Sequence, residues 1–188
     1  MKENTKKSKK IISITGIPGT GKTEVSEELS KLIDLKIITS EDLDMEKYYD
    51  TKRQCFVLDV ILLKKSLLKK LEEKKYEKGV IFDSHLSHLL PKEFVKYCFI
   101  LRCEPKQLKL RLEKRGYSKE KIRENVEAEI VDLLLVEAIS KKHKIHEINT
   151  THKTPKETAK EVYQVLTGKR KNSYGNIDFV NHVSDTLS

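Results

Sequence analysis

The chain has 188 residues, of which 37% are hydrophobic and 36% charged, and its formal net charge is +9. This length suits a single domain with a sizeable core. No apolar run approaches the roughly 20 residues of a membrane span, and the run "IISITGI" after the basic start is too short for a signal peptide, so we expect a cytoplasmic protein with no membrane partner.

The first ten residues form a basic arm with five lysines and one glutamate, which either stays solvated or contacts nucleic acid. From residue 11 onward, short β-branched runs alternate with longer helical patterns. Strands are predicted at 11–16, 36–39, 79–83, 97–103 and 145–150. Helices are predicted at 22–33, 59–77, 105–115, 118–143 and 154–167.

This alternation predicts an α/β domain at residues 11–167, in which helices cover both faces of a parallel sheet. The strand candidates are continuous apolar runs, as expected for strands that are buried on both sides. Residues 168–188 have weak periodicity and are expected to form a mobile or loosely docked tail.

Between the first predicted strand and the next helix lies "GIPGTGKT", residues 16–23, which fits G-x-x-x-x-G-K-[ST] at every fixed position. Glycines allow successive main-chain N–H groups to point inward and form a concave site for anions. The start of the helix adds free N–H groups and a positive dipole end. Lys22 brings a full charge to the outer phosphates, and the Thr23 hydroxyl suits Mg²⁺. This segment therefore predicts a site for ATP with Mg²⁺.

Other features narrow the class of nucleotide-binding protein. The chain lacks the Asn-Lys-x-Asp motif with which GTPases read guanine, and it is too short for a large motor ATPase. A small-molecule kinase or a compact ATPase remains.

A second candidate site is the segment "GVIFDSHLSHLLP", with Asp83 at the end of the third predicted strand and His85 two residues later. Residues two apart on an extended strand end face the same side, so both point into the crevice at the carboxyl edge of the sheet. Asp83 would hold Mg²⁺ directly or through water, and His85 would orient water or a phosphate oxygen. The alternative for His85 is packing against the next helix, and His88 is interpreted as helix surface.

A short lid is predicted at 114–124, where Arg-Gly-Tyr separates two helical segments. Arg115 in this lid would stabilise charge on the moving phosphoryl group. Arg111 and Arg123 are interpreted as residues on solvated helix faces.

Residues 39–62 lie between the second and third predicted strands and are rich in acids and tyrosines. This segment would cover the acceptor side of the crevice. Tyr48, Tyr49 and Arg53 are candidate contacts to an acceptor base or phosphate.

Together these segments resemble the adenylate-kinase-like ATPases of ribosome assembly, the coilin-interacting nuclear ATPase type of archaea and eukaryotes. The resemblance covers about residues 11–167 and rests on "ITGIPGTGKTEVSEELS", "GVIFDSHLSHLLP", "FILRCEP" and "RLEKRGYSKEKIRENVEAEI". Its distinguishing part is Asp-x-His at the end of strand three, combined with the Arg-Gly-Tyr lid and the acidic helix after it. It implies a five-stranded parallel sheet in the order 2-3-1-4-5, with an acceptor-binding insertion and a short lid.

The resemblance implies reversible phosphoryl transfer between ATP and AMP, tolerance for other nucleotides, and ATP hydrolysis. It further implies a role in late maturation of the small (30S/40S) ribosomal subunit and its rRNA, through transient binding of a platform ribosomal protein. We expect a monomer, and the basic arm is a candidate rRNA contact. The alternatives are a purely metabolic small-molecule kinase that balances adenine nucleotides, and a kinase for another substrate such as shikimate or a deoxynucleoside monophosphate.

By position, the resemblance also implies functional residues. Those implied as ATP contacts are Gly19, Thr20, Gly21, Lys22, Thr23, Glu24, Arg115 and Lys153. Lys22, Asp83, His85 and Arg115 would be catalytic, and Thr23 and Asp83 would hold the metal. The chain departs from the family at Glu24, where a second threonine is frequent. It also lacks an arginine in "EDLDMEK", so that Lys47, Arg53 or another residue would hold the acceptor phosphate.

Overall fold

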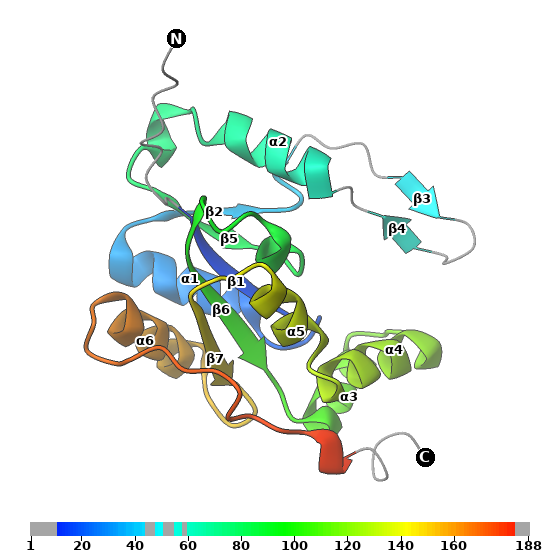
Figure 1. Cartoon of the computed structure of the whole chain (residues 1–188). Helices are drawn as coiled ribbons and strands as arrows, with labels where there is room; N and C mark the ends of the chain where they lie inside the picture. The colour runs from blue at the N-terminus through cyan, green and yellow to red at the C-terminus, as the bar shows by residue number, and fades with distance from the viewer. Residues whose placement is uncertain (1–10, 44–47, 51–54, 58–59, 183–188) are drawn as a thin grey trace.

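The structure, a computed structural model, describes residues 11–43, 48–50, 55–57 and 60–182. Its centre is a five-stranded sheet in which every neighbouring pair is parallel (Figure 1). In spatial order the strands are β2 (Lys36–Thr39), β5 (Val80–Asp83), β1 (Ile11–Gly16), β6 (Val95–Arg102) and β7 (Ile145–Asn149). Counted along the chain among these five, the order is 2-3-1-4-5, so the predicted fold is confirmed.

Helices cover both faces of the sheet, as the alternating sequence pattern predicts. The α-helices are α1 (Lys22–Ile33), α2 (Val60–Lys70), α3 (Pro105–Lys114), α4 (Lys119–Ile130), α5 (Leu133–Ser140) and α6 (Pro155–Leu166). Short 3₁₀ turns are η1 (Lys74–Tyr76), η2 (Ser87–Leu89) and η3 (Val180–His182). Helices α1 and α6 share one apolar cluster with one face of the sheet, and α2 to α5 share a second cluster with the other face. Of the helices in the described part of the chain, none is both long and apolar enough to span a bilayer.

Two predicted helices are divided in the structure. The segment 118–143 forms α4 and α5, with a break at Asp132, whose φ of 55° lies in the left-handed region. The Asp132 carboxylate accepts a hydrogen bond from Arg102, and this tertiary contact fixes a turn that no glycine or proline marks in the sequence. The segment 59–77 forms α2, which ends at Lys70, and the separate turn η1.

The predicted acceptor region contains a small antiparallel hairpin of β3 (Tyr48–Asp50) and β4 (Cys55–Val57). Figure 1 shows this hairpin apart from the main sheet, beyond the N-terminal end of α2. Tyr48 and Tyr49 lie in β3, where the structure describes the main chain alone, and Lys47 and Arg53 lie outside the described residues. Their predicted contacts to an acceptor stay predictions.

The described part of the chain after α6 contacts the sheet at several points, although most of its residues are exposed. It runs along the edge strand β7 and reaches the carboxyl end of β6 (Figure 1). The main-chain N–H of Glu147 donates to the Ser173 carbonyl at 2.9 Å, and the Ser173 N–H donates to His146 Nδ1 at 2.9 Å. Phe179 is buried, with its ring 5.3 Å from the Arg102 guanidinium carbon.

Candidate active site

The loop Gly16–Thr23 leads from β1, the central strand, directly into α1. At Gly16 a Cβ atom would lie 2.5 Å from Thr20 Oγ1 and 2.6 Å from the Leu101 carbonyl, so this turn has no room for a side chain. Gly21 precedes the helix with a φ of 92°, a conformation that favours glycine. Thr20 is buried and donates its hydroxyl hydrogen to the Ile17 carbonyl at 2.8 Å. Its main-chain N–H donates to the same carbonyl at 3.2 Å, and its own carbonyl accepts from the Thr150 hydroxyl at 3.0 Å. Thr20 therefore braces the loop from within.

Lys22 lies at the first position of α1 with its ammonium group beneath the loop. Nζ donates to the carbonyl of Gly16 at 2.9 Å and to that of Ile17 at 3.3 Å. Desolvation lowers the pKa of Lys22 to about 8, although the negative charge of Asp83 acts to raise it. A cation in this position is placed for a polyphosphate on the loop.

Asp83 ends β5, directly beside β1, and is 6% exposed. Desolvation raises the pKa of Asp83, while the Lys22 charge and a hydrogen bond from Thr23 oppose this rise. The structure thus brings together the two predicted metal ligands, a hydroxyl and a carboxylate from different elements. Hard oxygen donors of this kind suit Mg²⁺, which keeps several waters and also takes phosphate oxygens. Thr23 and Asp83 therefore fit the predicted metal.

His85 lies two residues after Asp83, and its side chain is exposed. The protein on its inner side partly desolvates the ring, and this effect, with the charge of Lys22, lowers the pKa of His85. Its imidazole is therefore neutral at pH 7 and able to accept a proton or a hydrogen bond. Because the charge of Lys22 contributes to the lower pKa of His85, these two predicted catalytic groups interact electrostatically.

A cavity of about 420 Å³ opens on the other side of the loop, which falls within the range of small-molecule sites. Its lining residues come from the loop, α1, α3 and its C-cap, the turn between β7 and α6, and the start of α6: Gly19, Thr20, Gly21, Glu24, Val25, Arg111, Lys114, Arg115, Thr150, Lys153, Pro155 and Thr158. Six of the predicted ATP contacts are therefore grouped here beside the phosphate loop. Arg115 Nη2 lies 3.6 Å from Glu24 Oε1, and because both side chains are about half exposed, this pair is weak.

Arg111 does not lie on a solvated helix face, so that interpretation is wrong. Its Nη1 donates to the Gly19 carbonyl at 3.2 Å, and its Nη2 donates to the Thr150 and Thr151 carbonyls at 3.1 Å each. The guanidinium thus joins the phosphate loop to the turn after β7. Arg111 lies four residues before Arg115, the residue that caps α3, and this spacing is the sequence signal that could have found it.

Of two further basic residues considered in the sequence, Lys153 lies at the cavity and Arg123 lies in solvent. Lys153 lines the cavity, and its ammonium donates to Glu161 Oε2 at 2.6 Å. Arg123 is exposed and pairs with Glu127 one turn along α4, as expected for a solvated face.

His88 is 1% exposed, so its interpretation as helix surface is wrong. Its Nδ1 lies 3.1 Å from Thr15 Oγ1 on β1, and its Nε2 lies 2.8 Å from Glu137 Oε2 on α5. The misreading arose because η2 is a single turn packed under α5, which the local sequence does not reveal.

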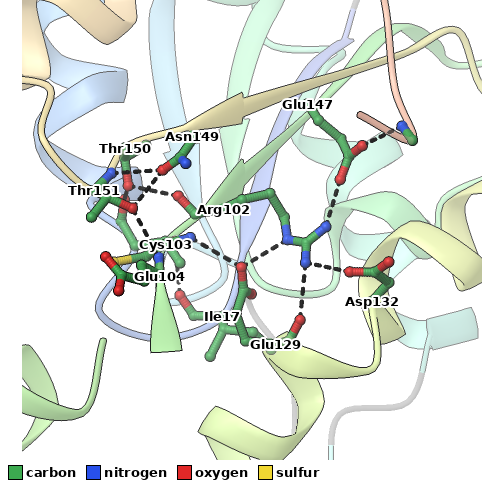
Figure 2. Close-up of polar contacts among 12 residues, drawn as sticks. Ile17, Arg102, Cys103, Glu104, Glu129, Asp132, Glu147, Asn149, Thr150 and Thr151 are labelled. Carbon is green, nitrogen blue, oxygen red and sulfur yellow. Dashed lines mark hydrogen bonds and ion pairs between the residues drawn. The ribbon is translucent and has the colours of Figure 1, made fainter. Parts of the chain in front are cut away.

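A buried ion cluster at the carboxyl end of β6 was also missed. Figure 2 shows the Arg102 guanidinium among Glu129 of α4, Asp132 at the α4–α5 break and Glu147 of β7. Its Nε lies 2.7 Å from Glu129, and its Nη1 lies 2.6 Å from Glu147. Glu129 also accepts from the Cys103 N–H at 3.0 Å, immediately before α3 begins. The cluster therefore fixes the bases of both helices that carry the predicted lid.

Comparisons with known proteins agree with this geometry. A family model described as "AAA domain" matches residues 12–132. A "Putative adenylate kinase" of Pyrococcus furiosus is 38% identical over 170 residues, covering 90% of this chain and 91% of that protein. A protein of the same name from Methanosarcina acetivorans is 40% identical over 188 residues, covering 92% of this chain and 99% of that protein.

Among solved structures, deoxyadenosine kinase from M. mycoides with bound dATP superposes with a TM-score of 0.52 at 18% identity, covering 84% of this chain and 98% of that chain. At this identity the likeness concerns the fold alone. The archaeal relatives extend over nearly the whole chain. The chain therefore belongs to the P-loop kinase family that includes these archaeal adenylate-kinase-type proteins.

Proposed function

We propose that the protein is a nucleoside monophosphate kinase that converts ATP and AMP into two molecules of ADP and tolerates other nucleotides. The observation that carries this proposal is the convergence of Lys22, Thr23 and Asp83 at one end of the phosphate loop, with a cavity of nucleoside size at its side. The choice of AMP is supported by the name of the archaeal relatives and by the resemblance described above.

In this proposal the loop amides and Lys22 hold the phosphates of ATP, and Arg115 closes over them and excludes water. A phosphate oxygen of AMP attacks the γ-phosphorus, and the bond from that phosphorus to the β–γ bridging oxygen breaks. One ADP forms on each side. Mg²⁺, held by Thr23 and Asp83, would neutralise charge on the phosphates.

We also propose that the same site hydrolyses ATP when no nucleotide acceptor is bound. His85, neutral at pH 7 and exposed two residues after Asp83, would then place water for attack on the γ-phosphorus. His85 therefore matters more to hydrolysis than to transfer.

An assay of ADP formation with and without AMP tests this assignment. Wild-type protein should form ADP faster with AMP present. Lys22→Ala should lose about 100-fold or more in both reactions, because it removes a charge from the reacting phosphates. His85→Ala should lose about tenfold or more in hydrolysis but much less in transfer.

His152→Ala is the matched control for His85, because His152 is exposed and is not among the residues that line the cavity. Unchanged rates in both Lys22→Ala and His85→Ala would remove the scheme. Equal ADP formation with and without AMP would leave a hydrolase.

We further propose a role in late small-subunit maturation, through transient binding of a platform ribosomal protein and contact with rRNA. The Asp-x-His pair and the Arg-Gly-Tyr lid support it by resemblance, and the basic arm adds a charge that suits RNA. A pull-down from lysate with and without ATP should retain a ribosomal protein in one state only. Rapid AMP phosphorylation with no such protein retained in either state would instead favour the purely metabolic kinase.

A further inference from the structure

A chain of buried polar groups lies beneath the phosphate loop and ends at the main chain of His85. Thr15, the residue before Gly16, is fully buried, and its hydroxyl oxygen has two neighbours. Oγ1 lies 3.1 Å from His88 Nδ1 and 3.3 Å from the His85 carbonyl oxygen. On the far side of the ring, His88 Nε2 lies 2.8 Å from a carboxylate oxygen of Glu137, which is 41% exposed.

Counting hydrogens separates two states of this chain. The Glu137 carboxylate can only accept, so the hydrogen on the neutral His88 ring belongs on Nε2. Nδ1 is then an acceptor, and the single hydroxyl hydrogen of Thr15 must serve either His88 Nδ1 or the His85 carbonyl. When His88 is protonated, Nδ1–H donates to Thr15 Oγ1, which leaves the hydroxyl hydrogen for the His85 carbonyl, and the charged ring also interacts directly with that carbonyl.

We propose that Thr15, His88 and Glu137 form a proton-dependent hydrogen-bond relay that positions the main chain of His85, which makes His88 a positioning residue for the phosphoryl-transfer site. The relay acts on the segment from Asp83 to His85, which carries a predicted metal ligand and the predicted water-placing group. It reaches that segment from β1, the strand that leads into the phosphate loop. This inference rests on the proposed function for its effect on turnover.

Neighbouring groups hold His88 in place and determine which protonation state of its ring prevails. His143 Nε2 bonds the His88 main-chain carbonyl at 2.8 Å and holds the residue from the side of α5 and β7. The charged or titratable groups that face the ring are Glu137 in α5, Lys141 at the C-cap of α5, His143 and His85. Burial lowers the pKa of His88, although the hydrogen bond and charge of Glu137 oppose this shift. The neutral imidazole therefore prevails at neutral pH, and the imidazolium forms at lower pH.

The first experiment compares Thr15→Val, which removes the hydroxyl at nearly constant volume, with Thr15→Ser, which keeps it. ATP affinity is measured by calorimetry, and kcat and KM by ADP formation with AMP. Thr15→Val should lower kcat by about tenfold or more, because a displaced reacting group is costly, with ATP affinity within about twofold of wild type. Thr15→Ser should restore kcat. Wild-type kcat in Thr15→Val, or equal losses of affinity and kcat in both variants, would overturn the positioning role.

The second experiment reads the relay without turnover, by NMR of the ¹⁵N-histidine-labelled protein. Neutral His88 should carry its hydrogen on Nε2, and Glu137→Ala, a change at a partly exposed position, should weaken this preference and lower the pKa of His88. Thr15→Val should also lower that pKa, because the imidazolium loses an acceptor. A hydrogen on Nδ1 in wild type, or a His88 titration that neither variant changes, would overturn the relay.

These two readouts separate the relay from the proposed function. Wild-type protein that forms no ADP from ATP and AMP would refute the proposed function, and the His88 tautomer and titration would still decide the relay. If the wild type is active and Thr15→Val has the same kcat, the positioning role alone is refuted.

Discussion

Individual side chains in the site combine charge with burial, and Lys22 illustrates the consequence. Its ammonium donates to two main-chain carbonyls in a desolvated position, which lowers its pKa to about 8. Part of the protein therefore carries a neutral Lys22 at pH 8. The polyphosphate of ATP would favour the charged form and raise this pKa.

ATP binding at pH 8 to 8.5 is therefore expected to take up a fraction of a proton. Calorimetry in buffers of different ionisation enthalpy measures this uptake, and affinity should fall as the pH rises above about 8. Lys22→Arg is the control, because arginine stays charged throughout this range and should abolish the uptake. Identical proton uptake in Lys22→Arg would assign it to another group.

Arg111 gives a second prediction at this scale. Arg111→Lys keeps the charge but loses the fork that bonds three carbonyls on two segments. We expect ATP affinity to fall by about tenfold, since about 1.4 kcal/mol corresponds to that factor. Arg123→Lys, a change on an exposed face, is the matched control and should bind ATP as wild type does.

The sequence identified those site residues whose role depends on local spacing. Lys22 and Thr23 follow from the glycine motif, and Asp83 follows from a strand end. Arg111 and His88 were misread because their partners come from segments 39 to 92 residues away, and a local pattern carries no information about such contacts.

Among the elements, α3, α4, α5 and β7 depend on one another through the Arg102 cluster. Desolvation alone would lower the pKa of Arg102, but Glu129 and the other carboxylates raise it, so the guanidinium stays charged. Burial raises the pKa of Glu129, although Arg102 opposes the rise. Buried charges of this kind are tolerated only while their partners remain in place.

Arg102→Met should therefore lower the free energy of unfolding by about 3–5 kcal/mol, because it leaves buried carboxylates without a partner. Chemical denaturation followed by circular dichroism measures this loss. Arg123→Met removes an exposed i,i+4 pair and should cost less than about 0.5 kcal/mol. Equal losses of unfolding free energy in the two variants would show that the buried cluster stabilises the fold no more than an exposed ion pair.

Element boundaries were predictable where local signals exist. Thr154 caps α6 with Glu157 in a reciprocal capping box, and this helix begins within one residue of the prediction. The break between α4 and α5 was missed because it depends on Asp132 meeting Arg102, 30 residues earlier.

At the scale of the whole molecule, the tail belongs to the folded domain. It bonds β7 through main-chain groups and covers Arg102 with Phe179. A chain ending at Thr167 should unfold at a lower denaturant concentration and self-associate, because it exposes an edge strand and a buried charge. A chain ending at His182 keeps every described tail contact and is the control. Wild-type stability in the shorter chain would show that the tail is dispensable for folding.

The central place of β1 also affects how the protein is made. This strand pairs with Val80–Asp83 on one side and with β6 on the other, so its partners are synthesised roughly 70 to 85 residues later. Parallel pairings between distant segments form slowly, because a long stretch of chain must close first. The strand that leads into the phosphate loop is thus synthesised well before either of its neighbours. Until residue 102 has emerged, this apolar strand lacks a partner on at least one side, and the growing chain is open to misassembly over this interval.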